Sequence, residues 1–154
     1  MPCKLTNISP ANLSDEPAKE VAPNSQQPLF YGLHAGFPAP VGDNANSIDL
    51  TREIVRHPES TFYARITGDS MRDAGIFDGD IVVIDRSLEA RDGNFVAAFI
   101  DGEFAIKEFR ADPDNHCAWL IAHNPQYPPI RVSADNDFTI WGVVTHNLHP
   151  LINS

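Results

Sequence analysis

The sequence predicts a mainly β protein: a compact antiparallel β domain with little helix, preceded by a flexible N-terminal arm. Three observations predict this fold class. Short runs rich in Val, Ile, Phe and Trp recur from residue 61 onward. Turn residues separate these runs, and Asp101-Gly102 between two of them is a strong hairpin signal. The first 40 residues hold seven of the 13 prolines and show no sustained hydrophobic period.

The chain divides into an arm over residues 1–35 and a β domain over residues 36–154. The arm is Pro-rich and polar, which is typical of an extended or disordered segment. Its end differs, because "LFYGLHAGFPAP" at 29–40 is an apolar island. Apolar side chains in an arm usually dock somewhere, so this island is either a strand packed on the domain or a segment that docks for a purpose.

After the arm, residues 47–57 are the best helix candidate. Ser47 or Asp49 is placed to cap it and Pro58 ends it. The strands that follow are expected at 61–66, 80–85, 94–100, 103–109, 118–123 and 138–146.

Composition excludes several function classes. The net charge is −10, and residues 36–154 hold 18 of the 21 acidic residues against nine of the 11 basic ones. Such a surface repels phosphate backbones, so no direct DNA binding is expected. No run approaches the roughly 20 apolar residues of a membrane helix, and no signal peptide is visible. Two cysteines are too few for a disulfide framework, so the cytoplasm is the expected compartment.

Two residues suggest chemistry. Ser70 stands in a turn after an apolar run, and Lys107 is the only lysine after residue 19. Alternation places Lys107 on the strand face of Ala105 and Phe109, which is a face that can be buried. Burial favours a neutral lysine, and a neutral lysine can take a proton from a serine. The alternative is a surface lysine that protects a strand edge.

Other constellations are weaker. His116, Cys117 and His123, or His146 with His149, can be drawn as metal ligands, but their spacing matches no known finger. No glycine loop for phosphate and no nucleophile elbow is present, although composition leaves a Ser-His-Asp triad open. The sequence therefore predicts no cofactor and no metal.

"TGDSMRDAGIFDGDIVVIDRS" at 67–87 resembles the active-site segment of the LexA/UmuD family of self-cleaving Ser-Lys peptidases. "DGEFAIKEF" at 101–109 resembles the family's lysine strand, and "HAGFPAP" at 34–40 resembles its scissile segment. "GDSM" and "GVVTH" are similar to the UmuD branch, and the arm is too short and too poorly charged for a repressor's DNA-binding domain.

The resemblance implies self-cleavage between Ala35 and Gly36, with Ser70 as nucleophile and Lys107 as its base. It implies activation by a RecA filament on single-stranded DNA. The product is expected to be a homodimer that serves a UmuC-type polymerase in error-prone translesion synthesis during the SOS response. Whether the arm is cut by its own molecule or by its dimer mate stays open.

Two alternatives remain at this point. One is a signal-peptidase-like Ser-Lys protease, which needs a membrane anchor. The other is a non-catalytic β interaction module in which Ser70 only shapes a turn. A histidine such as His34 or His123 also stays open as the base if lysine does not fill that role.

Overall fold

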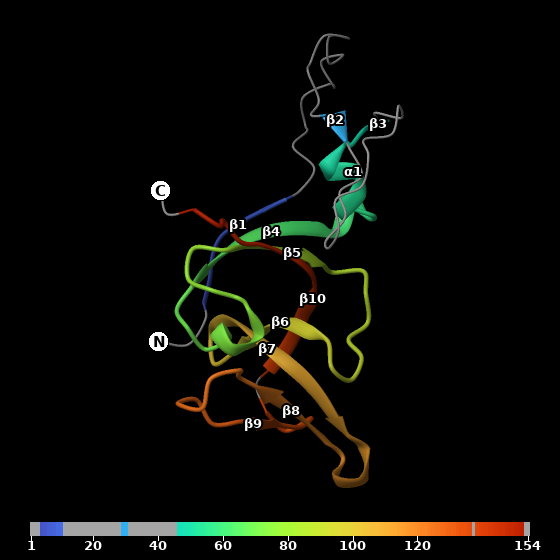
Figure 1. The fold of residues 1–154 in the computed structure, drawn as a ribbon. Coiled ribbons are helices and arrows are strands. Elements are labelled where there is room, and N and C mark those ends of the chain that lie inside the picture. The colour runs from blue at the N-terminus through green and yellow to red at the C-terminus, as the bar shows by residue number, and fades with distance from the viewer. Residues whose placement is uncertain (1–3, 11–28, 31–45, 137, 153–154) are drawn as a thin grey trace, which may run out of the picture. The chain divides into compact units, whose positions relative to one another are not determined.

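The computed structural model describes residues 4–10, 29–30, 46–136 and 138–152 of the chain (Figure 1). The chain forms two compact units, one made of residues 1–12 and 57–154 and the other of residues 13–56.

The smaller unit holds three short elements. Strand β2 (Leu29–Phe30) pairs antiparallel with β3 (Asn46–Ser47), and helix α1 (Leu50–Ile54) follows. Asp49 caps the helix by accepting a hydrogen bond from the Arg52 backbone N–H at 3.3 Å. The helix is shorter than the predicted 47–57, because the backbone is already extended at Asp49 and again at Val55. No helix in the described part of the chain is long and apolar enough to cross a membrane.

The larger unit is built on one antiparallel sheet of eight strands in the order β1-β4-β5-β10-β6-β7-β8-β9 (Figure 1). The strands are β1 (Lys4–Pro10), β4 (Thr61–Thr67), β5 (Ile81–Asp85), β6 (Phe95–Ile100), β7 (Glu103–Asp112), β8 (Cys117–Ile121), β9 (Ile130–Val132) and β10 (Phe138–Leu148). An additional pairing joins β1 to β7. The order therefore returns to its first strand, so that six strands form a ring and β8 and β9 extend from β7.

The predicted fold class is confirmed, and each of the six expected strands is present within a few residues of its expected ends. The hairpin between β6 and β7 turns at Asp101 and Gly102, whose φ angles are 49° and 84°. Positive φ at both positions is the signature of a two-residue hairpin turn. Strands β1, β3 and β9 were not predicted. β1 lies in the Pro-rich arm, and β9 has only three residues.

Two clusters of buried apolar side chains form the core. The larger one takes residues from β1, β4, β5, β6 and β7 together with Met71 and Ile76 from the connection between β4 and β5. The second takes residues from β6, β8 and β9, among them Leu120 and Val132. Gly142 on β10 lies so close to β5 that an added Cβ would stand 2.6 Å from the Ile84 side chain. The core thus holds both the strand that carries Lys107 and the turn that carries Ser70.

Candidate active site

Ser70 and Lys107 meet inside the larger unit. Lys107 Nζ donates a hydrogen bond to Ser70 Oγ over 3.0 Å, although 37 residues separate the two in sequence. Ser70 is 0% exposed and Lys107 is 4% exposed. The two residues that the sequence singled out for chemistry are therefore in direct contact and shielded from solvent.

Strand β7 places the lysine. Lys107 is level with Val96 of β6, and its neighbours Ile106 and Glu108 are buried as well. β7 also pairs on its other side, with β1 near one end and with β8 near the other. The alternative of a surface lysine at a strand edge is therefore wrong, because the strand is interior and the side chain is buried.

The turn after β4 places the serine. Gly68 has a φ of 101°, which an L side chain rarely adopts, and its N–H donates to Asp78 Oδ1 at 2.8 Å. Gly79 N–H donates to the Ile66 carbonyl at 2.8 Å, which ties the far end of the loop back to β4. Met71 is fully buried in the larger cluster. Ser70 thus stands between a glycine bend and an apolar anchor, and its position is tightly defined.

A second loop holds the same turn from outside. Asn124 Nδ2 donates to the Asp69 carbonyl at 3.1 Å, and the Tyr127 hydroxyl donates to Asp69 Oδ1 at 2.8 Å. This bond from Tyr127 is the main reason that the pKa of Asp69 lies below its usual value. The Tyr127 ring also lies 5.9 Å from Lys107 Nζ. Sequence analysis missed both loop residues, because nothing in "HNPQY" marks them except their polarity next to a strand end.

The alternative base His123 has another partner. Its Nε2 lies 2.5 Å from Glu108 Oε2, and the Arg110 guanidinium lies 2.6 Å from the other carboxylate oxygen. Glu108 is 6% exposed, so the arginine balances a buried charge, and the histidine hydrogen-bonds the same carboxylate. His123 therefore has a structural role beside the site. His34, the other histidine considered, lies outside the described residues.

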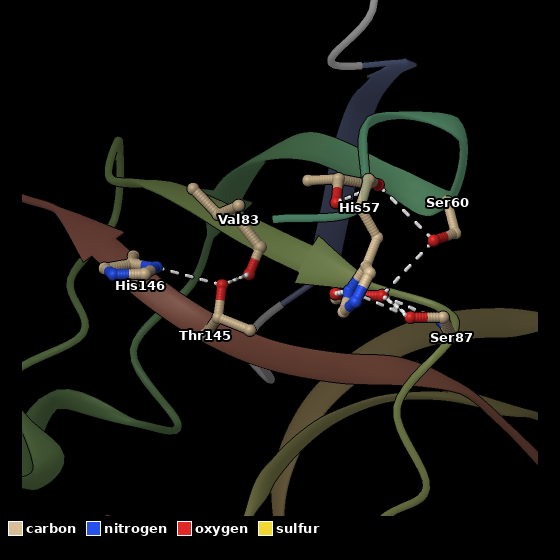
Figure 2. A network of polar contacts seen from close by, with 8 residues as sticks. His57, Ser60, Val83, Ser87, Thr145 and His146 are labelled. Atoms are coloured by element: carbon tan, nitrogen blue, oxygen red, sulfur yellow. Dashed lines mark hydrogen bonds and ion pairs between the residues drawn. The ribbon is translucent and has the colours of Figure 1, made fainter. Parts of the chain in front are cut away.

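A Ser-His-Asp grouping does exist elsewhere in the unit, close to the end of β5 (Figure 2). His57 Nδ1 lies 2.6 Å from Asp85 Oδ2 and 3.1 Å from Ser87 Oγ. The Ser87 hydroxyl donates to Asp85 Oδ1 at 2.6 Å. In a catalytic triad the serine and the carboxylate use opposite ring nitrogens. Here both face Nδ1 and the serine proton points to the carboxylate, so the grouping is not arranged as a triad.

The histidines and the cysteine considered as metal ligands do not gather. Cys117 contacts Asp112, His149 contacts Asp80, and His146 contacts Thr145, as Figure 2 shows for the last pair. Among the described residues, no group of three or more His, Cys, Asp or Glu side chains is arranged to hold a metal ion.

The expected cleavage site, Ala35 and Gly36, lies outside the described residues.

Several known proteins are similar to this chain over most of its length. Residues 28–145 match the model of the Peptidase S24-like family. MucA of Salmonella typhimurium is 42% identical over 123 residues, which cover 77% of this chain and 82% of MucA. SamA of the same species is 36% identical over 127 residues, 81% of this chain and 86% of SamA.

A LexA repressor of Corynebacterium jeikeium is 43% identical over 118 residues, which are 76% of this chain but only 42% of the repressor. The chain thus matches MucA and SamA over most of their length and the repressor over less than half. MucA and SamA are UmuD-like, so the expected resemblance to the UmuD branch is confirmed. The chain belongs to the Peptidase S24-like family, whose LexA- and UmuD-like members are self-cleaving serine peptidases.

Proposed function

We propose that this UmuD-like protein of SOS mutagenesis cleaves its own Ala35–Gly36 bond with Ser70 as nucleophile and Lys107 as general base. The observation that carries the proposal is the 3.0 Å hydrogen bond between Lys107 Nζ and Ser70 Oγ in a buried setting. A serine hydroxyl is a weak nucleophile until a neighbouring base takes its proton, and a neutral amine within hydrogen-bond reach is such a base.

Burial explains why lysine fills this role. Removal from water disfavours the ammonium form, and the neutral amine that results has a lone pair for the serine proton. Arginine stays charged in proteins and is unable to do the same. The 4% exposure of Lys107 thus supports its role as the general base.

The reaction runs in two stages. Neutral Lys107 takes the Ser70 proton while Oγ attacks the Ala35 carbonyl carbon, and backbone N–H groups at or beside Ser70 stabilise the oxyanion. Lys107 then gives the proton to the Gly36 nitrogen as the peptide bond breaks, which leaves an Ala35–Ser70 ester. Water, deprotonated by Lys107, hydrolyses the ester and frees Ser70. One oxyanion donor of this kind is worth about 3–4 kcal/mol in acyl transfer.

The small residues at the bond fit this chemistry. Ala35 and Gly36 are flanked by apolar residues in "LFYGLHAGF", so the segment can dock while its centre allows close approach. Gly36→Glu adds bulk and charge next to the attacked carbonyl and should block the reaction.

The test of the function is incubation of the purified chain at alkaline pH, followed by intact-mass measurement and N-terminal sequencing. The shorter product should begin Gly-Phe-Pro, and Gly36→Glu should remain whole. A product that begins elsewhere would overturn the assignment of the bond. A chain that never shortens itself, with or without an activating filament, would instead favour a non-catalytic interaction module.

The partners follow from the same proposal. The product is a homodimer, a RecA filament on single-stranded DNA accelerates the cut, and a UmuC-type polymerase receives the product in the cytoplasm. The net charge of −10 supports recruitment by a protein and not by DNA itself. Exposed apolar side chains on the strands, namely Phe99, Ile130 and Leu148, support a dimer contact. Sedimentation that shows only monomer at micromolar concentration would contradict the dimer.

A further inference from the structure

Strand β1 lies in a slot beside the candidate active site. Lys4 is level with Thr67 of β4 on one side and with Ala105 of β7 on the other. Thr67 stands three residues before Ser70, and Ala105 stands two residues before Lys107. The residues at the start of β1 are therefore bounded by the two strands that present the dyad.

Leu5 secures β1 in this slot. It is 8% exposed and belongs to the same apolar cluster as Ile66, Met71 and Ile106. Those three come from β4, from the residue after Ser70, and from the residue before Lys107. The slot thus binds its occupant in two ways, through strand pairing on both sides and through one apolar pocket, which is how sheets take up extended peptides.

A peptide bond that is to reach Ser70 and Lys107 needs the same surroundings. β4 ends three residues before Ser70, and β7 carries Lys107 two residues beyond Ala105. An extended backbone that enters between these strands at Thr67 and Ala105 is therefore close in sequence register to both groups. β1 already pairs with these strands. A segment that docks here would have to displace β1.

We propose that the slot between β4 and β7 is the extended-peptide site of this peptidase and that β1 fills it in the resting chain, so that β1 must leave before the arm is cut. The proposal rests on the proposed Ser70–Lys107 cleavage. It gives a reason for the activator that the proposed function includes, since the dyad is already hydrogen-bonded in the resting chain.

The first measurement leaves cleavage out. In the Ser70→Ala chain, Leu5→Asp puts a carboxylate into the apolar pocket and should expel β1. Amide hydrogen exchange in residues 62–67 and 103–106 should then become faster, because both strands lose a partner. Leu151→Asp makes the same chemical change at a side chain that is 94% exposed, and it should leave exchange in both strands unaltered. Unchanged exchange in the Leu5 variant would overturn the assignment of the slot.

The second measurement uses the active chain. Leu5→Asp should raise the rate of spontaneous self-cleavage by about tenfold or more, since burial of one leucine favours the bound strand by at least that factor. Leu151→Asp should cleave at the wild-type rate. A Leu5 variant that exchanges faster but cleaves at the wild-type rate or more slowly would show that β1 builds the site and does not block it, which overturns the proposal.

A rescue separates loss of the strand from general damage to the fold. A synthetic peptide of residues 1–12, added to the Leu5→Asp chain, should restore protection of both strands and slow cleavage again. The same peptide with aspartate in place of leucine should do neither. If the wild-type peptide does not restore protection of β4 and β7 from exchange, the assignment of the slot to β1 is wrong. If no chain in the series cleaves, the proposed function fails, and the exchange and peptide results still decide whether β1 is the occupant.

Discussion

Two places in the larger unit bring a serine to a proton acceptor, and they differ in what surrounds the serine. Ser70 follows β4, is fully buried and meets the amine of Lys107. Ser87 follows β5, lies at the surface and gives its proton to the carboxylate of Asp85. The second place even has a histidine, His57, whose side chain is 44% exposed.

The difference indicates that environment, more than residue type, distinguishes the proposed nucleophile from the other serine. Burial acts to raise the pKa of Asp85, but the hydrogen bonds from His57 and Ser87 outweigh it and hold that pKa below its usual value. A carboxylate with a low pKa is a weak base. Lys107 is an amine in a buried site, where burial disfavours the charged form, and a neutral amine is a much stronger base than a carboxylate. The familiar trio of residues is thus a structural network, and the less familiar pair is suited to catalysis.

The largest difference between the two serines is expected when each hydroxyl is removed in turn. Ser70→Ala should abolish self-cleavage, because it removes the hydroxyl that Lys107 Nζ contacts at 3.0 Å. Ser87→Ala should cleave at nearly the wild-type rate. Intact mass against time at alkaline pH measures both, and thermal unfolding checks that neither chain has lost its fold. Cleavage of the Ser70 variant at the normal rate would move the nucleophile elsewhere.

The rate of self-cleavage should depend on pH through Lys107 and not through the cluster of His57 and Asp85. If Lys107 is the base, the spontaneous rate should rise about tenfold per pH unit and level off once the amine is neutral. Lys107→Ala should remove the rise, and Lys107→Arg should not restore it. His57→Ala is the matched control and should keep the wild-type profile. A wild-type rate that is flat across the alkaline range would argue against a lysine base.

Much of this comparison could be predicted from sequence. Alternation along "EFAIKEF" put Lys107 on a face that can be buried, and Asp101-Gly102 fixed the hairpin that sets its register. The helix and strand positions followed from caps, turn residues and apolar runs. These signals are local, since each depends on residues within a few positions of one another.

What sequence reasoning missed depends on long-range contacts. Strand β1 has a polar sequence and ends at a proline, and it is a strand because β4 and β7 pair with it. Tyr127 reaches Asp69 across 58 positions, and no spacing rule marks such a pair. The cluster around His57 joins residues up to 30 positions apart. In each case the ring of strands brings the partners together, and the residue types alone do not.

The next largest effect concerns stability. Asp85→Asn removes a buried charge that accepts bonds from His57 and Ser87, and it should cost about 1–3 kcal/mol of unfolding free energy near neutral pH. The pKa of Asp85 is lowered by folding, so its contribution is present above the unfolded pKa of about 3.9 and is lost as pH falls through the lower folded value. Denaturant melts from pH 7 downward should therefore show the difference shrinking below about pH 4. A constant difference would mean that the charge of Asp85 is not its source.

The smallest effect should come from the loop that holds the catalytic turn. Tyr127→Phe keeps the ring beside Lys107 and removes only the hydroxyl that donates to Asp69 at 2.8 Å. The turn keeps its bond from Asn124 and its anchor at Met71, so cleavage should slow by only about twofold to tenfold, the range expected for one hydrogen bond. The alkaline pH profile should keep its shape, because Asp69 stays ionised throughout that range and Lys107 is unchanged. Asn124→Ala is the matched comparison and should act in the same direction through the Asp69 carbonyl. A Tyr127→Phe chain with an unchanged rate but a shifted profile would show that Tyr127 acts on the lysine and not on the position of the serine.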